Sequence, residues 1–131
     1  MSKPLPTIAM TPMPEFGYDD PVGQILRGEK AQTLRNGPRC GSSAEVTVGG
    51  EQTGIVLYFN RTKKMAKDEF LTAKFAIADG FRNSNRVSDN PKYIRSPLEN
   101  LQGLLARFYG KVPETMWCNY FQVVQQPEGI N

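Results

Sequence analysis

The side chains that most often carry out catalysis are scarce in this chain of 131 residues, which contains no histidine. That absence removes the commonest general base, the histidine-activated serine and cysteine nucleophiles, and every zinc site that uses a histidine ligand. Two cysteines, Cys40 and Cys118, are too few for a four-cysteine zinc site or for a disulfide framework. We interpret them as two free thiols, with one long-range disulfide as the alternative.

The remaining candidates for chemistry are carboxylates and one glycine-containing segment. Asp19 is followed by Asp20, and Asp68 by Glu69, but neighbours in sequence usually point apart and do not form a glycosidase or metal-dependent nuclease pair. Residues 37–43 contain glycine and serine without the spacing of a phosphate-binding loop. We therefore expect a protein that is not an enzyme and that uses neither a metal nor another cofactor.

Positive charge is concentrated in the middle of the chain. Residues 61–95 hold nine basic and four acidic groups, a net charge of +5, whereas residues 1–60 hold five basic and six acidic groups, a net charge of −1. Such a patch attracts polyanions, because lysine and arginine neutralise phosphates and release counterions. The alternative is a solvated surface. The candidate phosphate contacts are Arg61, Lys63, Lys64, Lys67, Lys74, Arg82 and Arg86.

A period of two in the apolar residues predicts three strands around these cations. The strands cover residues 44–48, 53–60 and 69–78, with a turn at Gly49-Gly50 and a lysine-rich loop at 61–68. Tyr58 and Phe70 then fall on faces opposite the larger apolar sets, and Lys74 shares a face with Phe70. These two rings are candidates for stacking on bases; the alternative is that they form a second core.

The other elements follow from capping and turn signals. Ser96-Pro97-Leu98-Glu99 combines a capping box with a proline at the first helical position, and predicts a helix over 97–109. Asp20-Pro21 predicts a shorter helix over about 21–35. Residues 115–125 are aromatic and β-branched, which predicts a last strand before a tail at 127–131.

The first 20 residues are rich in proline and show no helical or strand period. We expect them to form an extended arm that contacts a second copy of the chain or an assembly partner. No apolar run approaches the length of a membrane span, and prolines interrupt any signal-peptide core. The sequence therefore predicts that the protein is cytoplasmic and does not contact a membrane. Association with a virus particle is the alternative location.

The element order predicts a mainly β, α+β fold with one or two helices. Three antiparallel strands, a helix and a closing strand are the order of a small Greek-key barrel of the oligonucleotide-binding type. The domain organisation is then an arm at 1–20, a helix and connector at 21–43, and a barrel at 44–126. In element order and charge placement, residues 44–126 resemble the single-strand-binding proteins that have this fold.

Three functions remain open. The first hypothesis is a non-catalytic protein that binds single-stranded nucleic acid without sequence preference, through the basic residues and through Tyr58 and Phe70. The second is a structural or assembly protein of a virus or phage whose arm contacts neighbouring subunits. The third is a small inhibitor of a partner protein.

Overall fold

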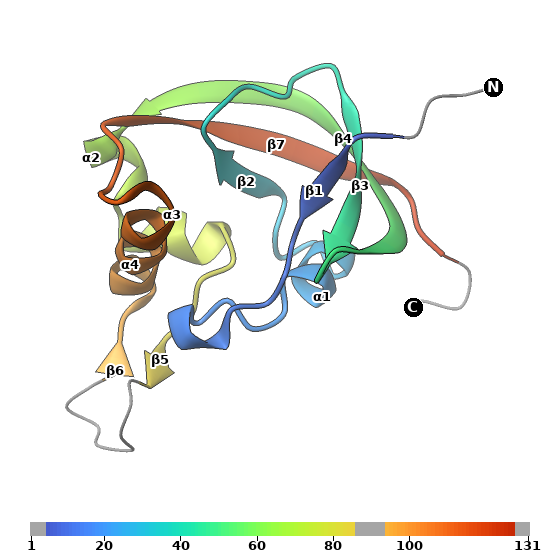
Figure 1. Cartoon of the computed structure of the whole chain (residues 1–131). Coiled ribbons are helices and arrows are strands. Elements are labelled where there is room, and N and C mark those ends of the chain that lie inside the picture. The colour runs from blue at the N-terminus through green and yellow to red at the C-terminus, as the bar shows by residue number, and fades with distance from the viewer. Residues whose placement is uncertain (1–4, 86–93, 128–131) are drawn as a thin grey trace.

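The computed structural model describes residues 5–85 and 94–127, which form a mixed five-stranded half-barrel with helices packed beside it (Figure 1). The strand order is β1-β3-β4-β7-β2. The strands of the sheet are β1 (Thr7–Ala9), β2 (Gln32–Arg35), β3 (Ser43–Val48), β4 (Glu51–Ala66) and β7 (Thr115–Gln125). The other elements are η1 (Pro14–Phe16), α1 (Pro21–Leu26), α2 (Lys67–Phe70), α3 (Ala73–Ala78), β5 (Ser84–Asn85), β6 (Ile94–Arg95) and α4 (Pro97–Tyr109).

The sheet is not the antiparallel Greek-key barrel that the element order predicted. Strands β1 and β3 run parallel, whereas β3, β4, β7 and β2 pair antiparallel in turn. Bulges interrupt the register between β4 and β7 at two places, and bulges bend a strand and increase its twist. The long β4 is curved (Figure 1), and it contributes residues to both clusters of buried apolar residues.

The predicted hairpin is confirmed, but its second strand is longer than expected. Strands β3 and β4 flank the turn at Gly49-Gly50. Residues 61–66, expected in a loop, continue β4 and pair with β7 as far as Ala66 and Thr115. The reason lies outside the segment, because β7 supplies the hydrogen-bonding partner and Met65 is buried opposite Met116.

The predicted strand over residues 69–78 is wrong, because this segment forms α2 and α3. The hydroxyl of Thr72 accepts a hydrogen bond from the Phe75 N–H at 3.1 Å and so caps α3. Phe75 and Ala76 are buried whereas Ile77 is exposed, which is a helical pattern and not an alternating one. Phe70, expected on an outer face, is fully buried in the core.

The predicted helix over 21–35 is right only in its first part. Asp20 caps α1 by accepting a hydrogen bond from the Gly23 N–H at 3.0 Å, as the sequence indicated. The helix ends at Leu26, and Gly28 has a φ of +77°, a conformation that favours glycine. Residues 32–35 then form β2, which pairs with β7.

Residues 5–20 belong to the body of the molecule and do not extend from it as a free arm. Strand β1 pairs with β3, and Ile8, Met10, Phe16 and Tyr18 are buried. In the sequence alone, the prolines of this segment indicate an extended arm. Proline disfavours a helix interior, but it is compatible with a short edge strand and with a 3₁₀ turn.

The predicted helix over 97–109 and strand over 115–125 are confirmed as α4 and β7. Ser96 and Glu99 form the expected capping box, with hydrogen bonds of 3.1 and 3.0 Å. Both cysteines are free thiols, Cys40 exposed and Cys118 buried. Among the described residues, no helix is long and apolar enough to cross a membrane.

Candidate functional site

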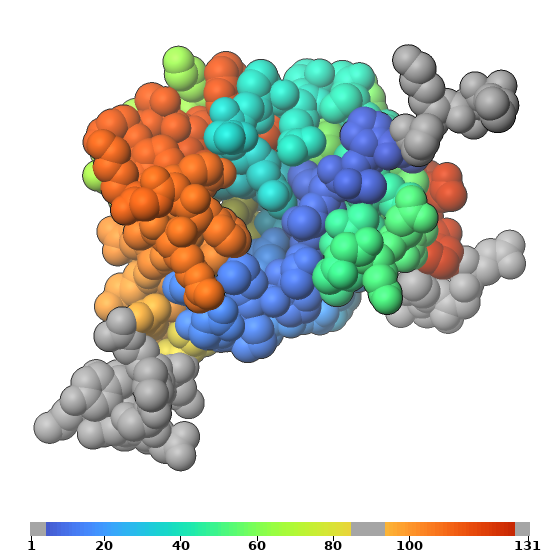
Figure 2. All heavy atoms as spheres, viewed as in Figure 1, coloured from blue at the N-terminus to red at the C-terminus, as the bar shows by residue number. Residues whose placement is uncertain are grey.

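A cleft of about 260 Å³ lies between α4, β2 and residues 5–20, which we call the N-terminal segment. It is the hollow between the orange helix and the blue N-terminal residues in Figure 2. Leu101, Leu104 and Leu105 of α4 supply an apolar wall, and Phe108 and Tyr109 also line the cleft. Phe108 is 61% exposed. A concave apolar site with a few polar groups is the usual form of a ligand-binding site.

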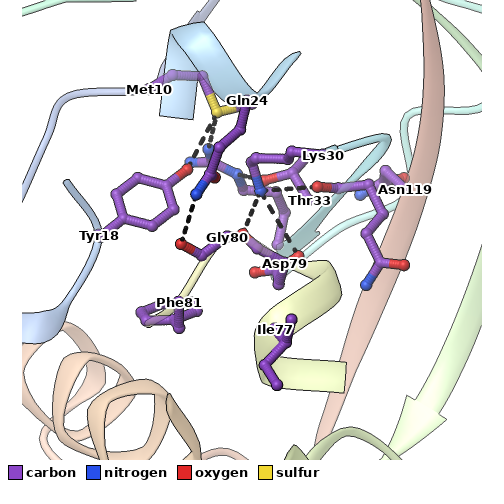
Figure 3. Close-up of polar contacts among 12 residues, drawn as sticks. Met10, Tyr18, Gln24, Lys30, Thr33, Ile77, Asp79, Gly80, Phe81 and Asn119 are labelled. Carbon is purple, nitrogen blue, oxygen red and sulfur yellow. Dashed lines mark hydrogen bonds and ion pairs between the residues drawn. The ribbon is translucent and has the colours of Figure 1, made fainter. Parts of the chain in front are cut away.

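The polar side of the cleft is built around two buried ionisable residues, Lys30 and Asp79, that come from distant parts of the chain. The fully buried Nζ of Lys30 donates hydrogen bonds to the carbonyl oxygens of Gln32 and Asp79, at 2.8 and 2.5 Å (Figure 3). It lies 3.8 Å from Oδ1 of Asp79. Asp79, the C-cap of α3, lines the cleft, whereas Lys30, two residues before β2, does not.

Burial shifts the pKa values of both groups towards their neutral forms. Loss of hydration lowers the pKa of Lys30, and the charge of Asp79 opposes this only in part. The same loss of hydration raises the pKa of Asp79, against the opposing effect of Lys30. Strongly shifted pairs of this kind concentrate at functional sites.

Two buried oxygens of this cluster have no hydrogen-bond partner among the described residues. They are Oδ1 of Asp79 and Oε1 of Gln24. The Nε2 of Gln24 donates to the carbonyl oxygen of Gly80 at 3.4 Å. Oδ1 of Asp79 has the ion pair with Lys30 but no hydrogen bond. Because a buried oxygen without a hydrogen bond costs about 1–3 kcal/mol, the Asp79 carboxyl is suited to accept one from a ligand in the cleft.

Arg35 brings a positive charge to the same cleft. Its Nη2 donates to the carbonyl oxygen of Ala9 at 2.9 Å, and its Nε donates to the Thr33 hydroxyl at 3.1 Å. These bonds hold the guanidinium between β2 and β1. In the described part of the chain, no group of three acidic or cysteine side chains comes together as a metal site.

The structure does not gather the predicted nucleic-acid contacts on one face. The guanidinium of Arg61 lies 4.7 Å from the ring centre of Tyr120, and Nζ of Lys64 lies 5.8 Å from that of Trp117. Each cation is paired with its aromatic partner across β4 and β7. Because residues three apart on a strand point to opposite faces, these two pairs lie on opposite faces of the sheet.

Two of the other predicted contacts are paired with carboxylates. Nζ of Lys63 lies 3.7 Å from Glu69, and that of Lys67 lies 3.9 Å from Glu114.

Tyr58 is half-buried on β4, and Lys74 is exposed on α3. Arg82 is half-buried and donates to the carbonyl oxygens of Ile77 and Phe81. Arg86 lies outside the described residues. Phe70, being buried, is not available for stacking.

Sequence reasoning missed the cleft and its polar residues. The sequence pattern places Lys30 in a predicted helix and Asp79 at the end of a predicted strand, and a charged side chain at either position indicates a solvated surface. The two residues are 49 positions apart, and nothing in the local pattern around either one indicates the other. Their helix-breaking neighbours Gly28 and Gly80, both with positive φ, were the nearest local signals.

No protein-family model and no curated protein sequence matches the chain. The structure is similar to that of protein EF3133 from Enterococcus faecalis V583, described with the family model DUF984. That similarity has a TM-score of 0.59 at 16% identity, over 96% of this chain and 80% of the other. The structure is also similar to an ASCH domain from Lactobacillus crispatus JV V101, with a TM-score of 0.56 at 18% identity, over 79% and 70% of the two chains. The fold is thus of the ASCH or PUA-like type, and the predicted oligonucleotide-binding barrel is wrong.

Proposed function

We propose that the protein binds single-stranded nucleic acid, RNA in particular, and that the cleft receives one unstacked base. The ASCH domain has a PUA-like fold, which is often implicated in RNA binding. The proposal is of binding without catalysis. It keeps the ligand class predicted from the sequence and moves its central contact from the strands to the cleft.

The composition of the cleft carries the proposal. Sequence-dependent recognition of single-stranded RNA uses bases that are splayed out, stacked on aromatic side chains and hydrogen-bonded along their edges. The cleft offers the exposed ring of Phe108, the carboxyl of Asp79 and the guanidinium of Arg35 within one cavity. At about 260 Å³, it lies just below the roughly 300–1,000 Å³ range of small-molecule sites, which fits a single ring system.

The exposed cations of β4 would supply the sequence-independent part of the affinity. Lys63 and Lys64 are exposed on this strand, and cations of this kind attract phosphates without reading bases. In this proposal they raise the affinity for any polyanion, whereas the cleft distinguishes single strands from duplexes.

Fluorescence anisotropy with a labelled single-stranded RNA, the matching DNA strand and the duplex tests the proposal. We expect the single-stranded RNA to bind best, with weaker binding at about 200 mM than at about 50 mM salt. Phe108→Ala should weaken binding by roughly 5- to 150-fold, the equivalent of about 1–3 kcal/mol for a lost stacking contact. Ile77→Ala, which changes an exposed residue of α3 outside the cleft, is the matched control. Equal binding to duplex, or an unchanged affinity in Phe108→Ala, would contradict the assignment of the cleft.

The buried carboxyl of Asp79, which lines the cleft beside Lys30, favours a second candidate function, acid–base chemistry on a small ligand in the cleft. Burial raises the pKa of Asp79, so its carboxyl can hold a proton at a higher pH than usual and donate it to a ligand, which is the role of a general acid. Hydrolysis of an activated aryl ester tests for such reactivity. A rate above background that Asp79→Asn removes would support this candidate, and a rate unaffected by that change would exclude it.

The predicted contact of residues 1–20 with a second copy or an assembly partner stays a prediction. The virus-particle and inhibitor hypotheses stay in the same position. Within residues 5–20, the contacts that the structure shows are with the rest of the same chain: β1 pairs with β3, and Ile8 and Met10 are buried.

A further inference from the structure

The last part of β7 has an open edge. Strand β2 pairs with residues 117–120 of β7, and the Phe121 N–H donates to the Ala31 carbonyl oxygen at 3.0 Å. Strand β4 continues along the opposite side of β7 as far as Gln125. Beyond Phe121, no described residue pairs with β7 on the β2 side, and Figure 1 shows β7 running on past the end of β2.

A groove follows this open edge. It has a volume of about 500 Å³ and lies between residues 121–126 and the segment from α1 to β2. Ile25 and Leu26 of α1 form part of its wall. In an antiparallel strand the N–H and C=O of one residue point to the same side, and alternate residues share a side. Because Phe121 points towards β2, Val123 presents its main-chain donor and acceptor to the groove.

The edge lacks most of the features that protect exposed strands from pairing. The sequence from Phe121 to Gln126 contains no charged residue and no proline, whereas natural edges usually carry lysine, proline or an inward charge. Val123 and Val124 are 37% and 53% exposed. Pro127 lies against Gly54 on the β4 side of the strand, away from the groove.

We propose that this edge pairs with the same edge of a second copy of the chain, around a twofold axis. An uncharged strand meets its own copy without like-charge repulsion, and antiparallel pairing of identical edges is compatible with a closed dimer. The two sheets then become continuous through β7. The bulge between Val123 and Gln125 limits the pairing to a short stretch, so the dimer is weak and reversible.

Sedimentation velocity over a range of about 1 to 200 µM protein tests the dimer by mass action. We expect a concentration-dependent shift from monomer to dimer, and at least a tenfold weaker association for Val124→Lys. Ile77→Lys places the same charge at an exposed apolar site on α3 and should leave the association unchanged. A monomer throughout the range overturns the proposal, and so does a dimer that Val124→Lys does not weaken.

Amide hydrogen exchange locates the contact independently of any effect of the variants on folding. The Val123 amide should exchange more slowly at high than at low protein concentration, whereas the Gln122 amide, which points towards β4, should not change. A dimer without this protection would lie elsewhere on the molecule and would also overturn the proposal. Both measurements are made without nucleic acid, so their outcome does not depend on the proposed function.

Discussion

Lys30 is the residue whose ionisation is most strongly coupled to folding. Its side chain is fully buried and donates to two main-chain carbonyl oxygens. Its pKa is lowered in the folded state, so the unfolded chain binds the proton more tightly in the window between the lowered value and about 10.5. Stability from this group therefore rises with pH through that window.

We predict that Lys30→Met lowers the free energy of unfolding by about 3–5 kcal/mol, the typical cost of removing one member of a buried pair. The cost should be larger at pH 9 than at pH 6. The cost of removing the proton from Lys30 on folding is smaller at pH 9 than at pH 6, so the wild-type side chain contributes more stability at pH 9. Without Lys30 the buried Asp79 is also harder to ionise. Urea unfolding at the two pH values, with Asp79→Asn and the double variant, completes the cycle. A cost that is the same at both pH values would show that Lys30 does not titrate in this window.

At the residue scale, Phe70 and Tyr58 show how the face of a side chain depends on the element that carries it. The outward assignment of Phe70 depended on a strand, and the helical geometry of α2 turns the same ring into the core. The assignment of Tyr58 used the correct strand and placed the ring opposite the buried Leu57 and Phe59, where it is half-buried. The face of a side chain is therefore only as predictable as the element that carries it.

Among the connecting elements, the turn after η1 joins the N-terminal segment to the helical side of the molecule. Gly17 has a φ of +66°, and the Arg82 N–H donates to its carbonyl oxygen at 2.9 Å. A Cβ on Gly17 would lie 2.0 Å from the carbonyl oxygen of Arg82. Both the backbone conformation and the close approach therefore require glycine.

We predict that Gly17→Ala lowers stability by at least about 2 kcal/mol, because the left-handed conformation alone costs a side chain about 1–2 kcal/mol. Gly41→Ala is the matched control, since Gly41 also has a positive φ, of +85°, but has no atom within 4 Å of an added Cβ. Thermal unfolding of the two variants separates the conformational cost from the steric cost. Equal losses would mean that the contact with Arg82 relaxes freely.

Elements with local signals were predictable, and elements defined by a distant partner were not. The helix α4 carries its cap, its first-turn proline and its stop within its own sequence, and its bounds were predicted without error. Residues 61–66 carry no strand signal of their own and are extended because β7 lies beside them. In residues 69–78 the apolar pattern fitted a period of two, but the Thr72 cap and three alanines favour a helix.

At the scale of the whole molecule, the candidate site depends on the packing of segments that are far apart in the sequence. The cleft is formed by the N-terminal segment, β2, the end of α3, and α4. The sequence indicated α4 and the cap of α1, but not that residues 5–20 form one wall of the cleft. If residues 5–20 formed a free arm, one wall of the cleft would be missing and there would be no cavity to predict. The wrong prediction for the N-terminal segment is therefore also the reason why the cleft was not predicted.

The two descriptions of the N-terminal segment make opposite predictions for stability. In the structure, Ile8 of β1 is buried between the strands and packs in the same apolar cluster as Val46 and Leu57. Ile8→Ala should therefore lower the free energy of unfolding by about 2–5 kcal/mol, the range for large-to-small substitutions in a core. Leu5→Ala, two residues before the strand and exposed, should change it by less than about 0.5 kcal/mol. Chemical unfolding followed by the fluorescence of Trp117 measures the unfolding free energy of both variants. Equally small losses in the two variants would contradict the packing of β1 and support a free arm.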